Sequence, residues 1–208
     1  MTPLAVVVGY VIGCVPTAGL IAGLRGIDLR REGSGNPGAK NALRTGGPVL
    51  ASAVLVVEAA KGYIAVWAGF QLAGEAGALA AGLGAVAGNV YNIWYRFEGG
   101  KGLGISLGVL AAAWPTVLPV LVVVIVLTAV ITRSAGLAAL GAMVALMVSS
   151  LVWPEQNWPS MGYVETSRQL FALSVAMTLI MMWKHIRDSP LNPTWRFESR
   201  TEVSPGRR

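Results

Sequence analysis

The sequence predicts an all-α, polytopic membrane protein with about seven transmembrane helices. Of its 208 residues, 54% are hydrophobic and only 12% are charged, which is about half the charged share of a soluble domain. The apolar residues form long runs, and most of these runs are long enough to cross a bilayer. Basic residues lie in the short stretches between the runs, as is typical of membrane proteins.

The expected spans follow one another with little intervening chain. In order they are Leu4–Leu24, Val49–Leu72, Ala76–Trp94, Thr116–Thr132, Ala135–Trp153 and Leu170–Trp183. The run Gly102–Trp114 is shorter, and its pattern does not distinguish a short membrane helix from a re-entrant segment. Residues 1–187 are therefore expected to form one membrane domain, and residues 188–208 a polar, mobile cytoplasmic tail.

The distribution of charge predicts the orientation. With the N-terminus outside, the outer loops keep Glu75, Glu155 and Glu165, and Arg168 is their one cation. The cytoplasmic stretches then receive the tail from Lys184 onward and Arg25, Arg30, Arg31, Lys40, Arg44, Arg96, Lys101 and Arg133. The opposite orientation would place almost every cation outside, against the positive-inside rule. This bias also accounts for the net charge of +6, so we expect no nucleic-acid partner.

The first polar patch is the stretch REGSGNPGAKN, residues 31–41. Glycines tolerate conformations that turn successive amides toward one anion, and this patch contains Gly33, Gly35 and Gly38. Its further donors and cations are Ser34, Asn36, Lys40, Asn41 and, just beyond it, Arg44. A phosphate cradle and an ordinary surface turn both fit this composition. A nucleotide-hydrolysing P-loop does not, because Lys40 is followed by asparagine instead of serine or threonine.

Two further patches and a histidine carry chemistry. Glu58 and Lys61 lie three apart within the second expected span, so they share a helix face and are expected to pair, either for function or as a structural ion pair. Lys101 stands among glycines at the expected start of a helix, which suits an anion, although a turn with a snorkelling lysine is the alternative. His185, the only histidine, lies at the end of the last span. It is either an interfacial residue or part of the site, because histidine is the side chain that can titrate near neutral pH.

Taken together, these patches resemble the motifs of the PlsY family, the bacterial acyl-phosphate:glycerol-3-phosphate acyltransferases. GSGNPGAKN is similar to the family's Gly-Ser-Gly-Asn-x-Gly-Ala-Thr-Asn, and EAAKG to its Asp-x-x-Lys-Gly. GNVYNIWYRFEGGKG is similar to Gly-His-x-x-Pro followed by Phe-Lys-Gly-Gly-Lys-Gly, and WKHIRD to the terminal Arg-His-Arg-Glu-Asn. The order is the same, and the resemblance covers most of the chain. It implies a multi-pass protein of the bacterial inner (plasma) membrane.

The resemblance implies transfer of a fatty acyl group from acyl phosphate to glycerol 3-phosphate, which gives lysophosphatidic acid and inorganic phosphate. Both substrates and membrane lipid are then the expected partners. The implied catalytic residues are Ser34, Lys101 and His185. The implied substrate-binding residues are Gly33, Gly35, Asn36, Gly38, Lys40, Asn41, Arg44, Lys61, Gly99 and Gly100. We expect no cofactor and no metal, because one histidine and scattered carboxylates form no recognisable ligand set.

The chain also departs from the family pattern, which makes it a divergent member. Asn89 stands in place of histidine, and Asp188 in place of asparagine. Further departures include Lys40 for threonine, Glu58 for aspartate, Asn92 for proline and Glu98 for lysine. An asparagine at position 89 cannot take up or release a proton as a histidine can. A carboxylate at position 188 would repel phosphate. The alternative hypothesis is therefore a non-catalytic or substrate-altered paralogue that binds or transports a phosphorylated lipid or polyol.

Overall fold

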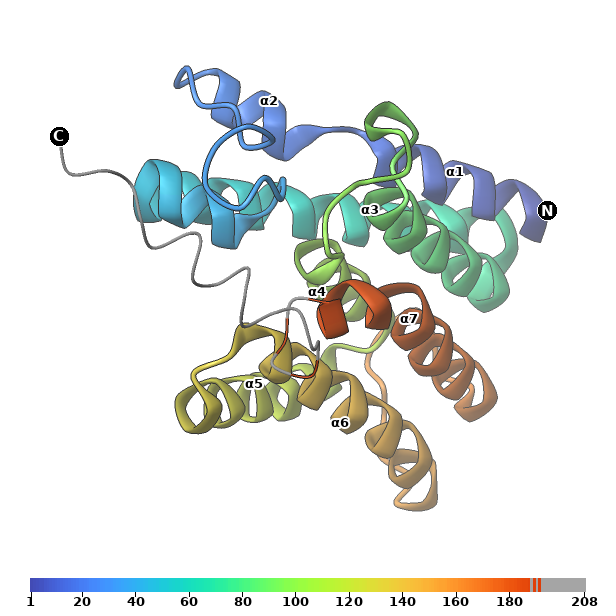
Figure 1. Ribbon diagram of the computed structural model, residues 1–208. Coiled ribbons are helices and arrows are strands. Elements are labelled where there is room, and N and C mark those ends of the chain that lie inside the picture. The colour runs from blue at the N-terminus through green and yellow to red at the C-terminus, as the bar shows by residue number, and fades with distance from the viewer. Residues whose placement is uncertain (188, 190, 192–208) are drawn as a thin grey trace, which may run out of the picture.

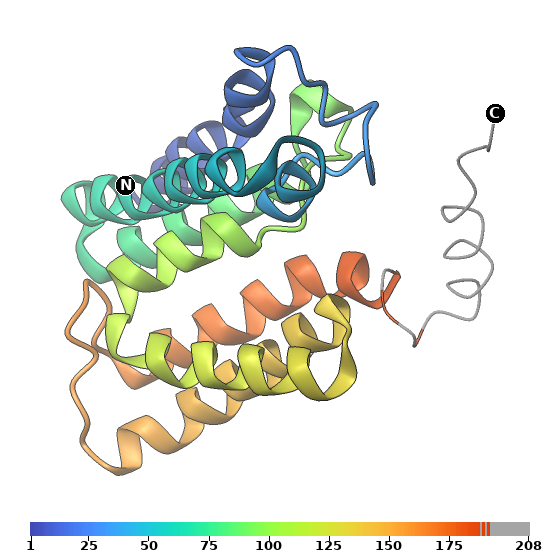
Figure 2. The ribbon, with the colours of Figure 1, turned by 90° about the vertical axis from the view of Figure 1, so that its left-hand side faces the viewer.

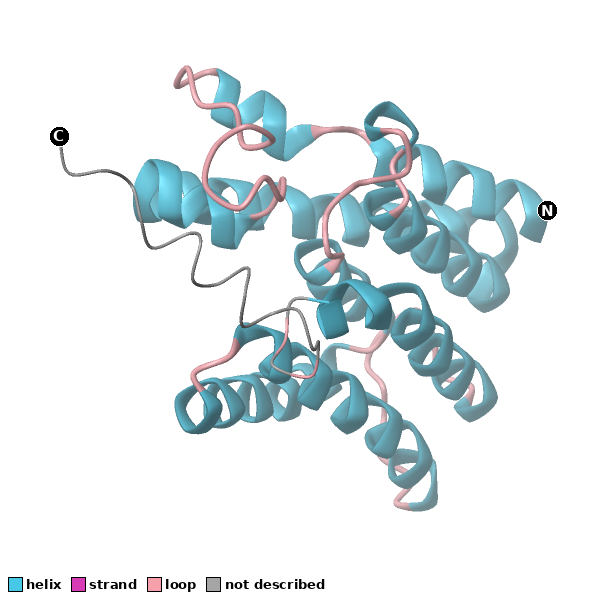
Figure 3. Cartoon of the chain, viewed as in Figure 1, coloured by secondary structure: helices cyan, strands magenta, loops and turns pink. Residues whose placement is uncertain are grey.

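The computed structural model describes residues 1–187, 189 and 191, and its regular structure there is helical (Figures 1 and 3). Within these residues, five helical segments are long and apolar enough to cross a membrane. The all-α membrane prediction is thus confirmed, whereas the count of about seven spans stays a prediction. Apart from Ser189 and Leu191, the expected tail lies outside the described residues, and so does Asp188.

Most helices follow the expected apolar runs, whereas α3 begins earlier than its run and covers two of them. In chain order they are α1 (Thr2–Cys14), α2 (Thr17–Gly23), α3 (Ala39–Val90), α4 (Leu103–Ala113), α5 (Leu118–Thr132), α6 (Ala135–Glu155) and α7 (Ser167–Arg187). Short 3-10 turns, η1 (Ile93–Tyr95) and η2 (Pro115–Val117), precede α4 and α5. The short apolar run Gly102–Trp114 forms a helix of its own, α4.

The long helix α3 reverses direction at Ala73 and Gly74, whose backbone dihedral angles are not helical. Gly69 and Gly77 flank the reversal, and a Cβ atom added to Gly69 would lie 2.2 Å from the carbonyl oxygen of Gly77. The two arms therefore touch, and α3 is a helical hairpin. A second interruption at Gly47, next to Pro48, separates the first turns of α3 from its apolar first arm.

The first expected span is interrupted near its middle. Pro16 cannot donate to a helix and disfavours helical geometry in the residue before it; accordingly Val15 has φ −59° and ψ 121°. The break turns main-chain carbonyl groups toward side-chain donors. The carbonyl oxygen of Cys14 accepts from Asn92 Nδ2 at 2.9 Å, and that of Val15 accepts from Lys61 Nζ at 2.7 Å.

Helix α1 packs closely against the second arm of α3 because small residues lie at the contact. A Cβ at Gly13 would lie 2.1 Å from the carbonyl oxygen of Ala85, and one at Gly88 would lie 2.2 Å from that of Tyr10. Glycines spaced four apart on both helices allow this approach, namely Gly9 and Gly13 on one and Gly84 and Gly88 on the other. Any larger residue at these positions would separate the two helices.

The polar loops gather at one end of the bundle (Figures 1 and 2). The loops joining α2 to α3, α3 to α4 and α5 to α6 lie there with the C-terminal end of α7. The N-terminus and the reversal of α3 lie at the opposite end. There the backbone amides of Tyr163 and Val164 donate to Ala112 and Ala113, the last residues of α4, at 2.9 and 3.2 Å. This contact satisfies helix-end carbonyls within the apolar region.

Candidate active site

The loop of residues 31–41 is shaped by glycine conformation and by one buried amide. Gly33 and Gly35 have φ of 60° and 69°, in the left-handed region that glycine adopts most readily. Asn41, 2% exposed at the start of α3, donates through Nδ2 to the carbonyl oxygens of Leu29 and Glu32 at 2.9 and 3.0 Å. Its Oδ1 accepts from the backbone amide of Ser34 at 2.8 Å. Asn41 therefore holds both sides of the loop.

This arrangement bears on the expected phosphate cradle. The backbone amide of Ser34 donates to Asn41, that of Gly35 to the carbonyl of Glu32, and that of Gly38 to the carbonyl of Asn36. These three amides thus stabilise the loop itself. The side chains of Ser34, Lys40 and Arg44 are exposed, and Asn36 is half-buried. These three amides are therefore not directed toward an anion in this structure.

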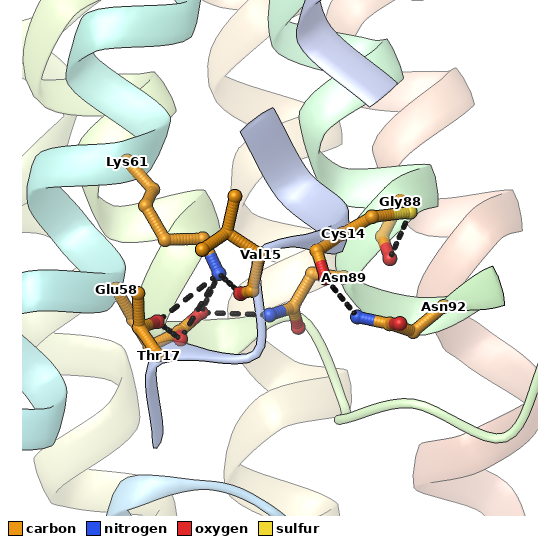
Figure 4. Close-up of polar contacts among 8 residues, drawn as sticks. All are labelled: Cys14, Val15, Thr17, Glu58, Lys61, Gly88, Asn89 and Asn92. Carbon is orange, nitrogen blue, oxygen red and sulfur yellow. Dashed lines mark hydrogen bonds and ion pairs between the residues drawn. The ribbon is translucent and has the colours of Figure 1, made fainter. Parts of the chain in front are cut away.

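Glu58 and Lys61 form the buried ion pair that the sequence predicts, at 3.1 Å (Figure 4). They are 6% and 7% exposed, in the first arm of α3. The carboxylate also accepts from Asn89 Nδ2 at 2.7 Å and from the hydroxyl of Thr17, the first residue of α2. Lys61 Nζ additionally donates to the carbonyl of Val15 and to Thr17 Oγ1, at 2.7 and 3.3 Å.

We call Thr17, Glu58, Lys61 and Asn89 the buried network. It joins three separate segments of chain: the break after α1 and both arms of α3. A buried ammonium requires such partners, because an unpaired charge in an apolar interior is costly. The structure therefore places Lys61 in contacts within the protein, where it supports the interrupted first span.

The glycines before Lys101 lie against the end of α3. The amide of Gly99 donates to Val90 and that of Gly100 to Asn89, both to carbonyl oxygens, at 3.1 and 2.9 Å. A Cβ at Gly99 would lie only 2.0 Å from the carbonyl oxygen of Asn89, so a larger residue would displace the loop. Lys101 itself is half-buried at the start of α4.

Arg30, in the loop that joins α2 to α3, contacts the segment that joins α3 to α4. Its Nη1 donates to the carbonyl oxygen of Glu98 at 2.5 Å, and its guanidinium lies 4.7 Å from the centre of the Tyr95 ring. A surface hollow is lined by these residues together with Trp94 and Arg96. These contacts hold the segment between α3 and α4 against the loop that leads into α3.

A small, partly open cavity lies where the three patches meet. Pro37 comes from the first patch, Glu58 from the second, and Asn89 and Gly100 from the third. The cavity measures about 10 Å³, room for about one water molecule. Side-chain motion would have to enlarge it before a substrate could enter. The convergence is nevertheless clear, because residues far apart in sequence line one space.

The end of α7 reaches the same region. His185 is 2% exposed, and its Nε2 lies 3.2 Å from the carbonyl oxygen of Lys101. A carbonyl oxygen can only accept, so this hydrogen bond requires the proton on Nε2. Lys184, the preceding residue, binds the end of α3 and the loop after it. It donates to the carbonyl oxygens of Val90, Gly99 and Gly100.

Among the predicted site residues, the structure brings Lys101 to His185, and Asn41 to the glycine loop. Lys40 and Arg44 lie exposed on the first turns of α3, at the same end of the bundle. Sequence reasoning missed Thr17 and Lys184. Lys184 had a usable signal, since it adjoins His185 within one motif. Thr17 had none beyond its place after Pro16.

The profile of the family described as glycerol-3-phosphate acyltransferase matches residues 3–190. The chain belongs to this glycerol-3-phosphate acyltransferase family. The family protein of Bradyrhizobium diazoefficiens is 37% identical over 185 residues, covering 88% of this chain and 87% of that one. The Symbiobacterium thermophilum protein is 41% identical over 142 residues, which cover 68% and 71% of the two chains. Both relatives carry the name glycerol-3-phosphate acyltransferase.

A solved structure has the same fold. It is the crystal structure of PlsY, an integral membrane glycerol 3-phosphate acyltransferase, in its glycerol 3-phosphate form. The TM-score is 0.78 at 25% identity, over 99% of this chain and 96% of that chain. The lysophosphatidic acid form of PlsY matches with a TM-score of 0.73 at 23% identity. This acyltransferase family member is therefore an integral membrane protein with the PlsY fold, and the resemblance seen in its motifs is confirmed.

Proposed function

We propose that this protein transfers a fatty acyl group from an acyl phosphate to the first hydroxyl of glycerol 3-phosphate, releasing inorganic phosphate and lysophosphatidic acid. The observation that carries this proposal is the convergence of the motif segments at one end of the bundle, around Glu58, Asn89 and Gly100. The names of the relatives and of the PlsY structures support the acceptor and the product. The acyl-phosphate donor is inferred from the motif resemblance.

In the proposed site, side chains bind the phosphate groups of the two substrates. Arg44, Lys101 and His185 would bind glycerol 3-phosphate, and the exposed Ser34 hydroxyl would donate from the first loop. Lys61 acts indirectly in this account, because its ammonium is buried against Glu58 and Val15. Its task is to hold the chain break in α1–α2 beside the site, and not to neutralise acyl phosphate.

The proposed chemistry needs no covalent enzyme intermediate. The glycerol hydroxyl oxygen attacks the acyl carbonyl carbon, and the bond from that carbon to the phosphate oxygen breaks. The leaving phosphate takes the electron pair, and the hydroxyl proton passes to phosphate or to His185. Acyl phosphate is already activated, so positioning of the two reactants supplies much of the acceleration. Donors near the developing oxyanion would add to it.

We further propose that the site faces the cytoplasm of a bacterial cell, with the N-terminus outside and about seven membrane segments. The hairpin of α3 supplies two of these segments, and α4 is the short one. Residues 1–187 would form the single membrane domain. Cysteine-substituted variants labelled from outside intact cells test this orientation, with sites at Glu75 and Arg133. Labelling is expected at position 75 and not at position 133.

The donor can be tested directly with purified protein in nanodiscs. Glycerol 3-phosphate is offered with palmitoyl phosphate or with palmitoyl coenzyme A, and lysophosphatidic acid is identified by mass spectrometry. We expect product and stoichiometric phosphate release only with palmitoyl phosphate. Product from the thioester alone would overturn the proposed donor, and absence of product from both would overturn the enzyme function.

The departures from the family pattern are also compatible with a second function. In it, the protein binds or transports a phosphorylated lipid or polyol without acyl transfer. The observation that favours it is the contact of Asn89 with Glu58, beside a cavity of about 10 Å³. Calorimetric binding of glycerol 3-phosphate without turnover of palmitoyl phosphate would favour this function. Turnover would exclude the non-catalytic form.

A further inference from the structure

Lys184, near the end of α7, binds the backbone of the loop that joins α3 to α4. Its Nζ donates to the carbonyl oxygens of Val90, Gly99 and Gly100, at 2.7, 2.8 and 3.2 Å. A lysine ammonium has three N–H donors. The geometry therefore directs this side chain to main-chain oxygens at the end of α3 and in the loop that follows it, across 84 to 94 positions of sequence.

The acceptors explain why a cation lies there. Val90 is the last residue of α3, and the final carbonyl groups of a helix have no partner within it. The negative end of the helix dipole favours a positive charge at this point. The ring centre of Tyr91 lies 5.9 Å from the same ammonium. Lys184 thus caps the C-terminal end of α3 from α7 and links these two helices.

The next residue continues the contact along the loop. His185 Nε2 lies 3.2 Å from the carbonyl oxygen of Lys101, so consecutive residues of α7 bind the consecutive carbonyls of Gly99, Gly100 and Lys101. Glycine-rich backbone has many accessible conformations. The contacts from α7 restrict the backbone from which the Lys101 side chain extends.

We propose that Lys184 is a positioning residue for acyl transfer, which fixes the backbone from which Lys101 extends. The proposal rests on the function proposed above, in which Lys101 binds phosphate. Lys184 acts through the carbonyls of Gly99 and Gly100, and it does not touch the substrate. Arginine is expected to replace it, because a guanidinium also offers several donors to carbonyl oxygens.

The test compares Lys184→Met, Lys184→Gln and Lys184→Arg with Arg133→Met, which removes an exposed cation at the same end of the bundle. Amide hydrogen exchange is measured over residues 89–104 in detergent. Lys184→Met is expected to speed exchange there about tenfold, as local opening becomes easier, with no change in α6. Lys184→Arg and Arg133→Met should resemble the wild type, and Lys184→Gln should lie between. Unchanged exchange in Lys184→Met would overturn the proposal.

The kinetic readout separates positioning from direct contact. Lys184→Met should lower kcat about 100-fold, as expected when a binding group is misplaced, while Lys184→Arg regains most of it. Lost activity with wild-type exchange and no rescue by arginine would mean direct substrate contact, against the proposal. An inactive wild type would overturn the proposed function itself, whereas the exchange measurement would still decide whether Lys184 orders the loop. Should Lys184→Met not fold, Lys184→Gln carries both readouts.

Discussion

The buried network and the glycine loop at residues 31–41 are both polar patches in an apolar chain, yet the structure uses them differently. In the network, the charges of Glu58 and Lys61 meet protein partners within the bundle. In the loop, one buried side chain, Asn41, holds the backbone, while Ser34 and Lys40 face outward. Polar character alone therefore does not identify a ligand contact in a membrane protein. The contacts of each polar group indicate whether it stabilises the fold or is available to a ligand.

The largest expected effect comes from removing the carboxylate of the network. Glu58→Ala leaves the Lys61 ammonium buried without its counter-charge, which should lower the free energy of unfolding by about 3–5 kcal/mol. Thermal unfolding in detergent, followed by circular dichroism, measures this loss. The matched control is Glu155→Ala, which removes an exposed carboxylate and should change stability by less than about 0.5 kcal/mol. Equal losses in the two variants would remove the distinction between the network and the surface.

A smaller loss is expected where the loop is anchored. Asn41→Ala deletes the hydrogen bonds to Leu29, Glu32 and Ser34, and should cost about 2–3 kcal/mol at about 1 kcal/mol for each bond. Trypsin should also cut faster beside Arg30 in this variant. Asn36→Ala, a change of a half-buried residue in the same loop, serves as the control. If both variants resist trypsin like the wild type, Asn41 does not hold the loop.

Replacement of Asn89 by the residue of the family pattern should have a mild effect. In Asn89→His, a ring N–H can still donate to Glu58, so we expect folding to be retained and acyl transfer to be preserved or raised. Initial rates and unfolding temperatures of this variant and of Asn89→Leu, which removes the donor, measure the difference. A steep loss of rate in the histidine variant alone would mean that the site is built around asparagine.

The smallest expected change in stability is that of Ser34→Ala, within about 0.5 kcal/mol, because the side chain is exposed. Its rate of acyl transfer should nevertheless fall about 100-fold, as for loss of one donor at a reacting centre. Unfolding and initial-rate measurements on one preparation give both values. An unaltered rate would show that the outward face of the loop does not contact substrate.

Much of the fold could be predicted from the sequence because apolar runs in a membrane protein have a direct structural meaning. The run Val49–Leu72 forms the first arm of α3, and Gly102–Trp114 contains the short α4. The break at Pro16 was missed, because the apolar run continues through it. Its structural result depends on distant donors, Lys61 and Asn92, which hydropathy does not reveal.

The residues of the site could be predicted from the sequence more readily than the contacts that they make. The pairing of Glu58 with Lys61 follows from helical spacing and is confirmed. The part played by Asn41 depends on which carbonyls the folded loop presents to it, so its residue type alone does not reveal it. The same holds for Lys184, whose acceptors lie in another loop. The assignments of Ser34, Arg44 and Lys101 to substrate stay predictions.

In the proposed function, the converging loops form one site for acyl transfer to glycerol 3-phosphate. Its most direct test is the initial rate of glycerol-3-phosphate-dependent phosphate release from palmitoyl phosphate, for wild-type protein and for Lys101→Ala with the same unfolding temperature. We expect phosphate release and lysophosphatidic acid from the wild type, and a rate at least about 100-fold lower in the variant. Equal rates in the two proteins would contradict it.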